Sequence, residues 1–233
     1  MPKAADMKVL IFGATGAAGA SVLRACLDAP VVTEVRAIVR RPLHRQHAKL
    51  RTFIHRDFTD YSAVAEAFDG IDACLFCLGT SVRQVPGEAE YRRITYDFAM
   101  AAARMVRERS PGAAFHFISG KSTRLDSRMM WSRVKAETER DLIGLVGAVC
   151  WRPGFIDGET STSSPRLYQA LRPAMRLLRG FRSLYISGQE IGNAMLQATL
   201  EGQRSCIVEN PEFREIAARA RFGGTTPAPA HAR

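Results

Sequence analysis

The sequence predicts a Rossmann-like α/β domain, with a doubly wound parallel sheet and a small C-terminal elaboration. Short apolar segments alternate with longer amphipathic segments from the N-terminus to about residue 151. This alternation is typical of βαβ units around a buried parallel sheet. A glycine-rich turn follows the first apolar segment and opens the first amphipathic one. Right-handed crossovers between such units close into a doubly wound sheet.

Composition favours one sizeable domain over a disordered or fibrous chain. The 233 residues are 46% hydrophobic and 24% charged, and no apolar run is long enough to span a membrane. The net charge is +10, and 28 of the 33 basic residues are arginine. Arginine pairs well with phosphate, so this balance favours a phosphorylated ligand, nucleic acid or an anionic surface.

The cysteines and the N-terminus predict a cytoplasmic protein. Five cysteines form no even, closely spaced framework, which fits a reducing compartment. Lys3 and Lys8 precede the apolar run 9–12 as in a signal peptide, but glycines interrupt that run directly. We therefore expect a mature N-terminus.

The elements of the main domain follow from the apolar runs and the amphipathic stretches between them. Apolar runs predict strands at 8–12, 34–39, 50–55, 73–78, 113–119 and 147–151. Amphipathic stretches predict helices at 17–27, 61–68, 88–109 and 130–143. Together they make a single Rossmann-like domain over residues 1–222.

The C-terminal part predicts a smaller elaboration over residues 156–221. Its expected elements are a basic helix at 167–178 interrupted by Pro173, a strand at 183–187, a helix at 190–200, a strand at 206–208 and a helix from 211 to 221. Arginines between 166 and 182 alternate with leucines. Such a pattern could bind a phosphate backbone or a membrane face, but it is more often found in an ordinary amphipathic helix that buries its leucines. Residues 223–233 have little to bury, so we expect a disordered tail.

The glycine-rich turn is the strongest local signal. Glycine allows a sharp turn and close approach of the backbone to a pyrophosphate, and the helix that follows offers unpaired N–H groups. The alternative is a tight strand–helix turn with packing glycines. We assign cofactor binding to Gly13, Thr15, Gly16, Ala17, Ala18 and Gly19.

Two arginines at the end of the second strand indicate the cofactor. An acidic residue there would bind the 2′-hydroxyl of an adenine ribose, whereas arginine accommodates a 2′-phosphate. The chain has Arg40 and Arg41 and no acid at this point. We therefore expect NADP(H) rather than NAD(H), with a solvated basic turn as the alternative.

Later motifs, in order, carry a resemblance to a known family. After the glycine turn and the arginines come Asp57-Phe58, Leu78-Gly79-Thr80, Phe117-Ile118-Ser119, Lys135 and Arg152-Pro153-Gly154. This series resembles the atypical short-chain dehydrogenases/reductases. It is most similar to the NAD(P)H-binding group that contains the mammalian Tat-interacting protein and small bacterial oxidoreductase-like proteins. The resemblance spans about residues 7 to 208.

The resemblance implies further cofactor contacts. Asp57 would bind the adenine amino group with Phe58 beside the ring, although Asp57 could instead cap the helix at 61. The ribose and nicotinamide side would be lined by Leu78, Gly79 and Thr80, although Gly79 could simply end a strand. The nicotinamide itself would be bordered by Pro153, Gly154 and Phe155.

The resemblance also implies a catalytic set, with one departure. In the family a serine polarises a carbonyl, a tyrosine transfers the proton, and a lysine four residues later lowers the pKa of that tyrosine. Ser119 and Lys135 stand at the first and last positions, but Trp131 replaces the tyrosine. Indole does not ionise usefully near neutral pH. Tyr168 and Tyr185 are the other tyrosines that could reach the cleft.

Three other patterns have plainer interpretations. Lys135 could pair with Glu139 on one helix face, although the family uses this lysine to bind the nicotinamide ribose as well. Cys74 and Cys77 lie three apart in a predicted strand, so they face opposite sides of the sheet and are expected to be core residues. His44 and His47 lie in a basic loop, and we expect no metal site.

Two functions remain open. The first is an NADPH-dependent oxidoreductase acting on a small carbonyl substrate that the sequence does not identify. The second is a catalytically silent NADPH-binding protein that regulates a partner. We expect neither a nucleic acid nor a membrane partner, and the resemblance implies a homodimer formed through helices 88–109 and 130–143.

Overall fold

The computed structural model describes residues 6–158 and 185–220. Within these ranges, seven parallel strands form one sheet in the order β3-β2-β1-β4-β5-β6-β9. The strands are β1 (Met7–Phe12), β2 (Val32–Val39), β3 (Leu50–Ile54), β4 (Ala73–Phe76), β5 (Ala114–Ile118), β6 (Val149–Arg152) and β9 (Cys206–Glu209). The order reverses direction between β1 and β4, as in a doubly wound dinucleotide-binding fold. The predicted fold class is confirmed.

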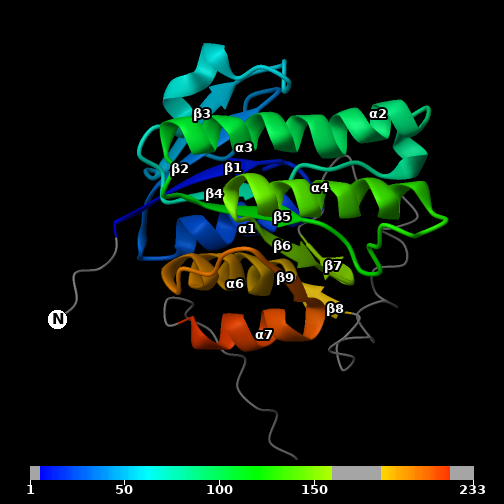
Figure 1. Cartoon of the computed structure of the whole chain (residues 1–233). Coiled ribbons are helices and arrows are strands. Elements are labelled where there is room, and N and C mark those ends of the chain that lie inside the picture. The colour runs from blue at the N-terminus through cyan, green and yellow to red at the C-terminus, as the bar shows by residue number, and fades with distance from the viewer. Residues whose placement is uncertain (1–5, 159–184, 221–233) are drawn as a thin grey trace, which may run out of the picture.

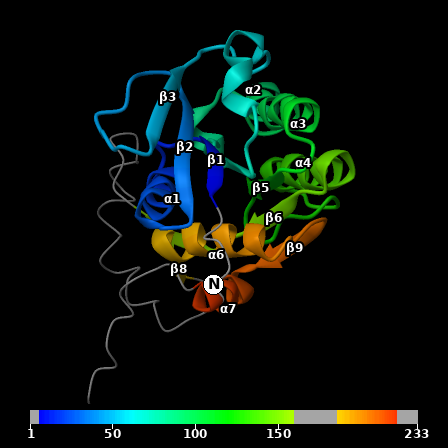
Figure 2. The same ribbon diagram turned by 90° about the vertical axis from the view of Figure 1, so that its left-hand side faces the viewer.

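Helices cover both faces of this sheet (Figures 1 and 2). The helices are α1 (Ala17–Asp28), α2 (Glu88–Arg92), α3 (Phe98–Arg109), α4 (Met130–Val146), α6 (Gly188–Leu200) and α7 (Asn210–Arg219). One core layer joins the sheet to α1, α6 and α7, and the other joins it to α3 and α4. Cys77 belongs to the first core and Cys74 to the second, so the predicted pair of buried cysteines on opposite faces is confirmed.

Two predicted helices have irregular backbones. The segment expected as a helix at 61–68 is a 3₁₀ segment, Ser62–Phe68. The helix expected at 88–109 is divided, because the π turn Arg93–Asp97 separates α2 from α3. A π turn inserts one residue into a helix and is frequent beside functional sites. A short 3₁₀ turn, Val82–Gln84, precedes α2.

A second, small sheet pairs β7 (Phe155–Asp157) with β8 (Tyr185–Ser187). The sequence does not indicate β7, because three half-buried residues are too few to form an apolar run. Beside this sheet, α6 packs tightly on α1, and a Cβ on Gly188 or Gly192 would overlap the side chains of Ser21 or Ala25. Small residues on both helices therefore allow close contact.

Several predicted features lie outside the described residues: the basic helix at 167–178, the arginines between 166 and 182, Tyr168 and the tail from 223. No described helix is long and apolar enough to cross a membrane. His44 and His47 lie in an exposed loop, as expected.

Candidate functional site

The glycine turn after β1 lies against the loop after β4. Gly13 has a φ of +75°, and a Cβ there would lie 2.7 Å from the backbone of Cys77 and Leu78. A Cβ on Gly19 would overlap the carbonyl oxygen of Gly13. Packing within the protein therefore explains both glycines, and these two positions agree with the alternative of a tight strand–helix turn.

Gly16 is different, because the protein leaves space above it. It is the N-cap residue of α1 and has extended backbone angles, φ −79° and ψ 165°. A Cβ there would have one neighbour, the carbonyl oxygen of Gly13 at 3.4 Å, which is an ordinary contact. No side chain caps this helix and no acidic residue lies in its first turn. The first N–H groups of α1 thus face a cradle that a side chain at position 16 would fill, which fits a bound pyrophosphate.

Arg40 and Arg41 lie at the carboxyl end of β2, one strand away from the glycine turn. Both side chains are exposed, and neither forms an ion pair with a described residue. Thr15 is exposed in the glycine turn itself. The fold therefore places free guanidinium groups at the edge where a ribose would lie in a doubly wound domain.

Asp57 and Phe58 follow β3. The Asp57 carboxylate accepts hydrogen bonds from the backbone N–H of Thr59, at 3.0 Å, and from its hydroxyl, at 2.5 Å. These bonds hold the pKa of Asp57 below its usual value. The turn before Ser62 is capped by Asp60, not by Asp57, so that alternative role is wrong.

The side chain of Phe58 belongs to the core. It is 3% exposed and packs against Phe12, Tyr61 and Phe98, with ring centroids 5.5 to 6.3 Å apart. The expected position beside an adenine ring is therefore not available to this side chain. Only backbone atoms of Phe58 could face a cofactor.

The loop after β4 borders an open hollow. Leu78 and Thr80 are half-buried, whereas Gly79 is exposed and a Cβ added to it would meet no atom within 4 Å. Thr80 and the residues that follow it line a hollow of about 450 Å³ together with Tyr91 of α2 and Trp131 of α4. This hollow lies at the carboxyl side of the sheet, where doubly wound domains bind their ligands.

Ser119 and Lys135 come together at the end of β5. The Lys135 Nζ donates to the carbonyl oxygens of Ser119, at 2.6 Å, and of Ile118, at 3.4 Å. The Ser119 side chain is buried, and its Oγ lies 3.3 Å from the Thr123 hydroxyl. Burial lowers the pKa of Lys135 to about 8, although the nearby Glu139 carboxylate opposes the shift. The site residues predicted from the motifs are therefore neighbours.

Trp131 lies one helical turn before Lys135 and borders the same loop. A Cβ on Gly120 would lie 3.8 Å from both the Trp131 ring and the Lys135 Nζ. Ser132 faces away, since its hydroxyl donates to the carbonyl oxygen of Ser122 and accepts from the N–H of Arg124. Trp131, at the sequence position where the resemblance expects a tyrosine, thus lies beside Lys135, whereas Ser132 does not face the same loop.

Glu139 does not pair with Lys135, contrary to one of the two expectations. Its carboxylate is 2% exposed and accepts two hydrogen bonds from Arg152, at 2.9 and 2.6 Å. Arg152 also pairs with Glu209 of β9 at 3.2 Å. This charge cluster ties α4 to β6 and β9. The resemblance marks the Arg-Pro-Gly motif, but the acidic partners of Arg152 carry no signal of their own in the sequence.

The segment after β6 is held by backbone contacts near the candidate site. The carbonyl oxygen of Pro153 accepts from the N–H of Lys121 at 3.0 Å, and the N–H of Gly154 donates to Asn210 at 2.9 Å. Phe155 packs on Tyr185. Tyr185 is 3% exposed and its hydroxyl donates to Asp157 at 2.7 Å, so this tyrosine is already engaged elsewhere.

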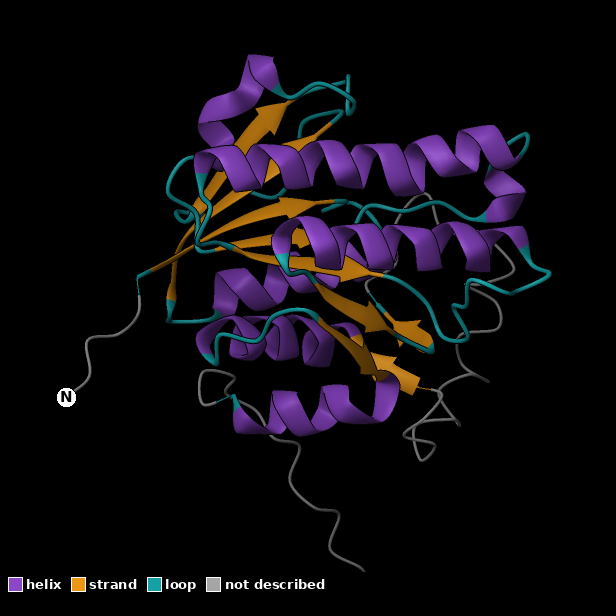
Figure 3. Cartoon of the chain, in the orientation of Figure 1, coloured by secondary structure: helices purple, strands orange, loops and turns teal. Residues whose placement is uncertain are grey.

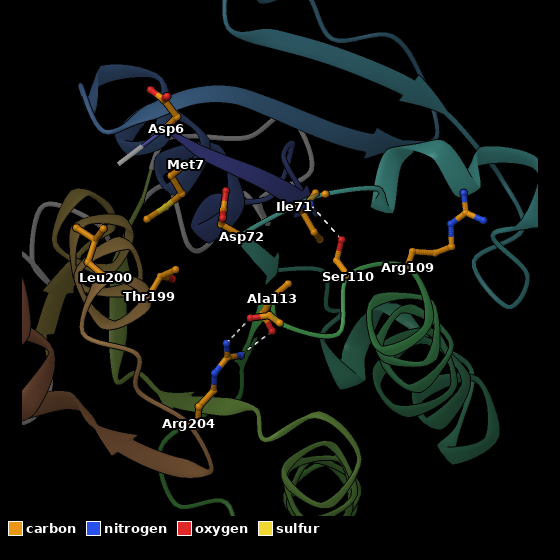
Figure 4. A pocket seen from close by; sticks show the side chains of 12 residues that line it. Asp6, Met7, Ile71, Asp72, Arg109, Ser110, Ala113, Thr199, Leu200 and Arg204 are labelled. Atoms are coloured by element: carbon orange, nitrogen blue, oxygen red, sulfur yellow. Dashed lines mark hydrogen bonds between the residues drawn. The ribbon is translucent and has the colours of Figure 1, made fainter. Parts of the chain in front are cut away.

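A larger hollow of about 660 Å³ lies at the opposite, amino-terminal edge of the sheet (Figure 4). Most of its charged side chains already have partners. Arg109 pairs with Asp69, Asp72 accepts from the N–H of Lys8, and Arg204 donates to two backbone carbonyl oxygens. Ligands of doubly wound sheets bind at the carboxyl ends of the strands, which are the tips of the orange arrows in Figure 3. We therefore place the candidate site at the smaller hollow.

Part of the chain matches a known family. Residues 13–114 match a family model described as NAD(P)H-binding. This segment contains the glycine turn, the arginines after β2 and the loop after β4. The fold is of the Rossmann class, and this segment of it is similar to NAD(P)H-binding domains. This match and the fold agree with the resemblance to the atypical short-chain dehydrogenases/reductases.

Curated relatives cover nearly the whole chain. One is protein FMP52, mitochondrial, from Eremothecium gossypii, which is 27% identical over 220 residues, or 90% of this chain and 97% of the relative. The Saccharomyces cerevisiae protein of the same name is 26% identical and covers 83% of this chain and 88% of the relative. Because these relatives are named as mitochondrial, the prediction of a cytoplasmic protein is wrong. Cysteine content reports a reducing environment but does not identify the compartment.

Solved structures share the fold at low sequence identity. A short-chain dehydrogenase/reductase family oxidoreductase from Burkholderia thailandensis has a TM-score of 0.66 at 16% identity, covering 88% of this chain and 91% of that one. The dTDP-glucose 4,6-dehydratase DesIV from Streptomyces venezuelae, solved with NAD bound, has a TM-score of 0.66 at 16% identity, covering 91% and 80%. These structures show the shared fold, and it is the NAD(P)H-binding match of residues 13–114 that supports a nicotinamide cofactor, without a preference for its phosphorylated form.

Proposed function

We propose that this protein is an NADP(H)-dependent oxidoreductase that reduces a small carbonyl compound. The observation that carries the proposal is the contact of Lys135 with Ser119 next to Trp131, which lines an open hollow at the carboxyl side of the sheet. The matched NAD(P)H-binding segment forms the other side of the same edge. A reduced nicotinamide, when bound, supplies a hydride to an electrophilic carbon.

The choice of NADP(H) rests on Arg40 and Arg41. Their exposed guanidinium groups have no ion-pair partner among the described residues, so both are available to a 2′-phosphate. Arginine donates two parallel hydrogen bonds to a phosphate group, and such charge-assisted bonds are about twice as strong as neutral ones. A free 2′-hydroxyl would receive no comparable contact from either side chain.

The remaining residues would bind the cofactor and orient the substrate carbonyl group. The first N–H groups of α1 would hold the pyrophosphate above Gly16. Lys135 would donate to the nicotinamide ribose. Its contact with the Ser119 carbonyl oxygen fixes the position of the ammonium group relative to the end of β5. The Ser119 hydroxyl would donate to the substrate carbonyl oxygen and so polarise the bond that the hydride attacks.

A silent NADPH-binding protein is the second candidate, and Trp131 is the observation that favours it. The indole N–H is a donor that does not transfer its proton near neutral pH. If no other group supplies a proton, the bound cofactor would persist unreacted. The protein could then report the NADPH level to a partner.

Calorimetric titration with each cofactor tests the proposed preference. NADPH should bind at least about ten-fold tighter than NADH, because a charge-assisted hydrogen bond is worth about 1.5–3 kcal/mol. Arg40→Ala should remove most of this preference. The control is Arg51→Ala, which removes an exposed arginine of β3 that pairs with Glu66 and should leave the preference intact. Equal affinities of the wild type for both cofactors would exclude the assignment.

Turnover is tested separately. NADPH absorbance is followed with a panel of aldehydes, ketones and quinones. Reduction of at least one class supports the oxidoreductase. Tight NADPH binding without any reduction favours the silent protein.

A further inference from the structure

The hollow beside Trp131 contains another tyrosine. Tyr91 of α2 lines it together with Trp131, Thr80 and Ser81. Thr80 and Ser81 follow β4, on the side where the nicotinamide would lie, and Trp131 stands where the family's tyrosine is expected. Tyr91 thus faces the space that a substrate carbonyl group would occupy in the proposed reaction.

Ion pairs fix the helix that carries Tyr91 against the helix that carries Trp131 and Lys135. Glu88 pairs with Arg133 at 3.7 Å, and Arg92 pairs with Glu137. Each helix contributes two residues four positions apart, so the two pairs stack along the contact. Tyr91 lies between Glu88 and Arg92 in the sequence, and its position beside the hollow is held from both ends.

The other described tyrosines are engaged in hydrogen bonds. The hydroxyl of Tyr61 donates to the backbone of Phe98, that of Tyr96 to Asp141, and that of Tyr185 to Asp157. Within the described part of the chain Tyr91 forms no such bond to a carboxylate or a backbone oxygen, and its polar neighbour is the Thr95 hydroxyl. The residue is 2% exposed and lines the hollow.

We propose that Tyr91 supplies the proton that Trp131 cannot, by donating its hydroxyl hydrogen to the oxygen of a carbonyl substrate held in this hollow. This inference rests on the proposed reduction. The carbonyl carbon receives a hydride from the reduced nicotinamide, and the π pair of the C=O bond moves to the oxygen. That oxygen takes the proton of Tyr91, and water returns a proton to the resulting phenolate. The product is an alcohol, and the cofactor is oxidised.

The surroundings keep Tyr91 in the protonated, donating form. Burial raises its pKa above the usual value. A polar contact with the Thr95 hydroxyl, one helical turn further on, lowers the pKa of Tyr91 and offsets part of this rise. The Thr95 hydroxyl is itself buried and has no hydrogen bond of normal geometry among the described residues. The nearby charges are Arg83 at the hollow and the two ion pairs between the helices, Glu88–Arg133 and Arg92–Glu137. A phenol of this kind donates up to alkaline pH.

Tyr91→Phe tests the proposal, with Tyr96→Phe as the matched control. Both variants remove one hydroxyl from the same stretch of chain, but the Tyr96 hydroxyl bonds to Asp141 and does not line the hollow. Single-turnover reduction of benzaldehyde by NADPH should fall about 10²-fold or more in Tyr91→Phe, the usual scale of general acid catalysis. The NADPH Kd should stay within about two-fold of the wild type. Tyr96→Phe should retain the wild-type rate.

A second readout does not depend on turnover. With tyrosine labelled at ¹³Cζ, the Tyr91 resonance is assigned as the one missing from Tyr91→Phe. Adding benzaldehyde to the NADP⁺ complex, in which no hydride can transfer, should shift this resonance and leave that of Tyr96 in place. A titration with pH should show Tyr91 ionising at a higher pH than an ordinary exposed tyrosine.

The outcomes separate the two proposals. If the wild type reduces benzaldehyde and Tyr91→Phe does so within about three-fold, the oxidoreductase stands and Tyr91 is not the donor. If the wild type binds NADPH but reduces nothing, and benzaldehyde does not move the Tyr91 resonance, both proposals fail. A slow Tyr91→Phe variant with unchanged NADPH affinity and a shifted wild-type resonance supports both.

Discussion

The Lys135 ammonium group donates a 2.6 Å hydrogen bond to the carbonyl oxygen of Ser119. This bond joins α4 to the end of β5, so the two residues that the family motif places 16 positions apart are fixed to each other through the backbone. The lysine consequently lies at a defined height above the sheet before any ligand binds. The ammonium group is also largely buried, and this burial lowers its pKa.

Lys135 should make the stability of the protein depend on pH. Its folded-state pKa of about 8 lies below the usual 10.5, so between these values the folded protein binds fewer protons than the unfolded chain. Lys135 therefore increases the free energy of unfolding as the pH rises from about 8 to about 10.5. The contribution is on the order of 1–3 kcal/mol.

The test compares Lys135→Met with the wild type in urea unfolding from about pH 7 to about pH 10.5. The variant should be more stable relative to the wild type at the lower pH than at the higher one. Buried cysteines with raised pKa values, such as Cys26, act in the opposite direction, but they are common to both proteins and cancel in the difference. A difference that does not change with pH would contradict the prediction.

The buried pair Glu139–Arg152 should be important for stability. Glu139→Gln removes the charge that two hydrogen bonds from Arg152 compensate, and Arg152 retains only the half-exposed Glu209. Breaking a buried ion pair typically costs about 3–5 kcal/mol. Since Arg152 keeps one partner, we expect about 2–3 kcal/mol in chemical denaturation.

The control for this pair is Arg51→Met, which breaks the exposed pair of Arg51 and Glu66. It should cost less than about 1 kcal/mol. The double variant Glu139→Met/Arg152→Met should recover much of the stability lost in Glu139→Gln, because it leaves no unpaired buried charge.

Gly16 and Gly19 should differ sharply when each is replaced by valine. A Cβ at Gly16 has an ordinary contact, whereas one at Gly19 would overlap the carbonyl oxygen of Gly13. Gly16→Val should keep the fold and its unfolding midpoint but lose at least about 100-fold in NADPH affinity, since its methyl groups fill the pyrophosphate cradle. Gly19→Val should destabilise the fold itself.

Circular dichroism and calorimetric titration distinguish these effects. A folded Gly16→Val variant with normal NADPH affinity would show that the phosphate lies elsewhere.

The sequence is a good guide where a pattern repeats or where one residue type is required. The apolar runs predict the strands of the main sheet, because a strand buried on both faces must be apolar throughout. The glycine turn is located in the same way, but sequence alone cannot separate its glycines. Only the packing shows that Gly13 and Gly19 are required because a Cβ there would overlap backbone atoms, whereas a Cβ at Gly16 would not.

Contacts between distant segments are beyond the sequence. The spacing of four suggests that Lys135 pairs with Glu139, yet Arg152 of β6 takes that carboxylate. A motif assigns Phe58 to the adenine ring, yet its side chain packs in an aromatic core. Tyr91 carries no motif, and its nearness to Trp131 depends on how α2 docks on α4.

Moving the phenol from position 91 to position 131 is the most direct test of how the site works. In Tyr91→Phe, the added substitution Trp131→Tyr restores a hydroxyl at the family position, one helical turn before Lys135. The lysine charge should lower the pKa of the new phenol, whereas burial raises that of Tyr91. The double variant should therefore regain carbonyl reduction, about 10²-fold or more over Tyr91→Phe, with a pH dependence shifted toward lower pH.

Trp131→Phe in the same background is the control, because it changes the aromatic wall without adding a hydroxyl, and it should remain inactive. Rates with NADPH and benzaldehyde from about pH 6 to about pH 10 provide the measurement. Equal rates for the tyrosine and phenylalanine variants would mean that a hydroxyl at position 131 cannot reach the substrate. The hollow would then bind the carbonyl group in a different orientation from that of the family, with its oxygen toward α2 rather than toward Lys135.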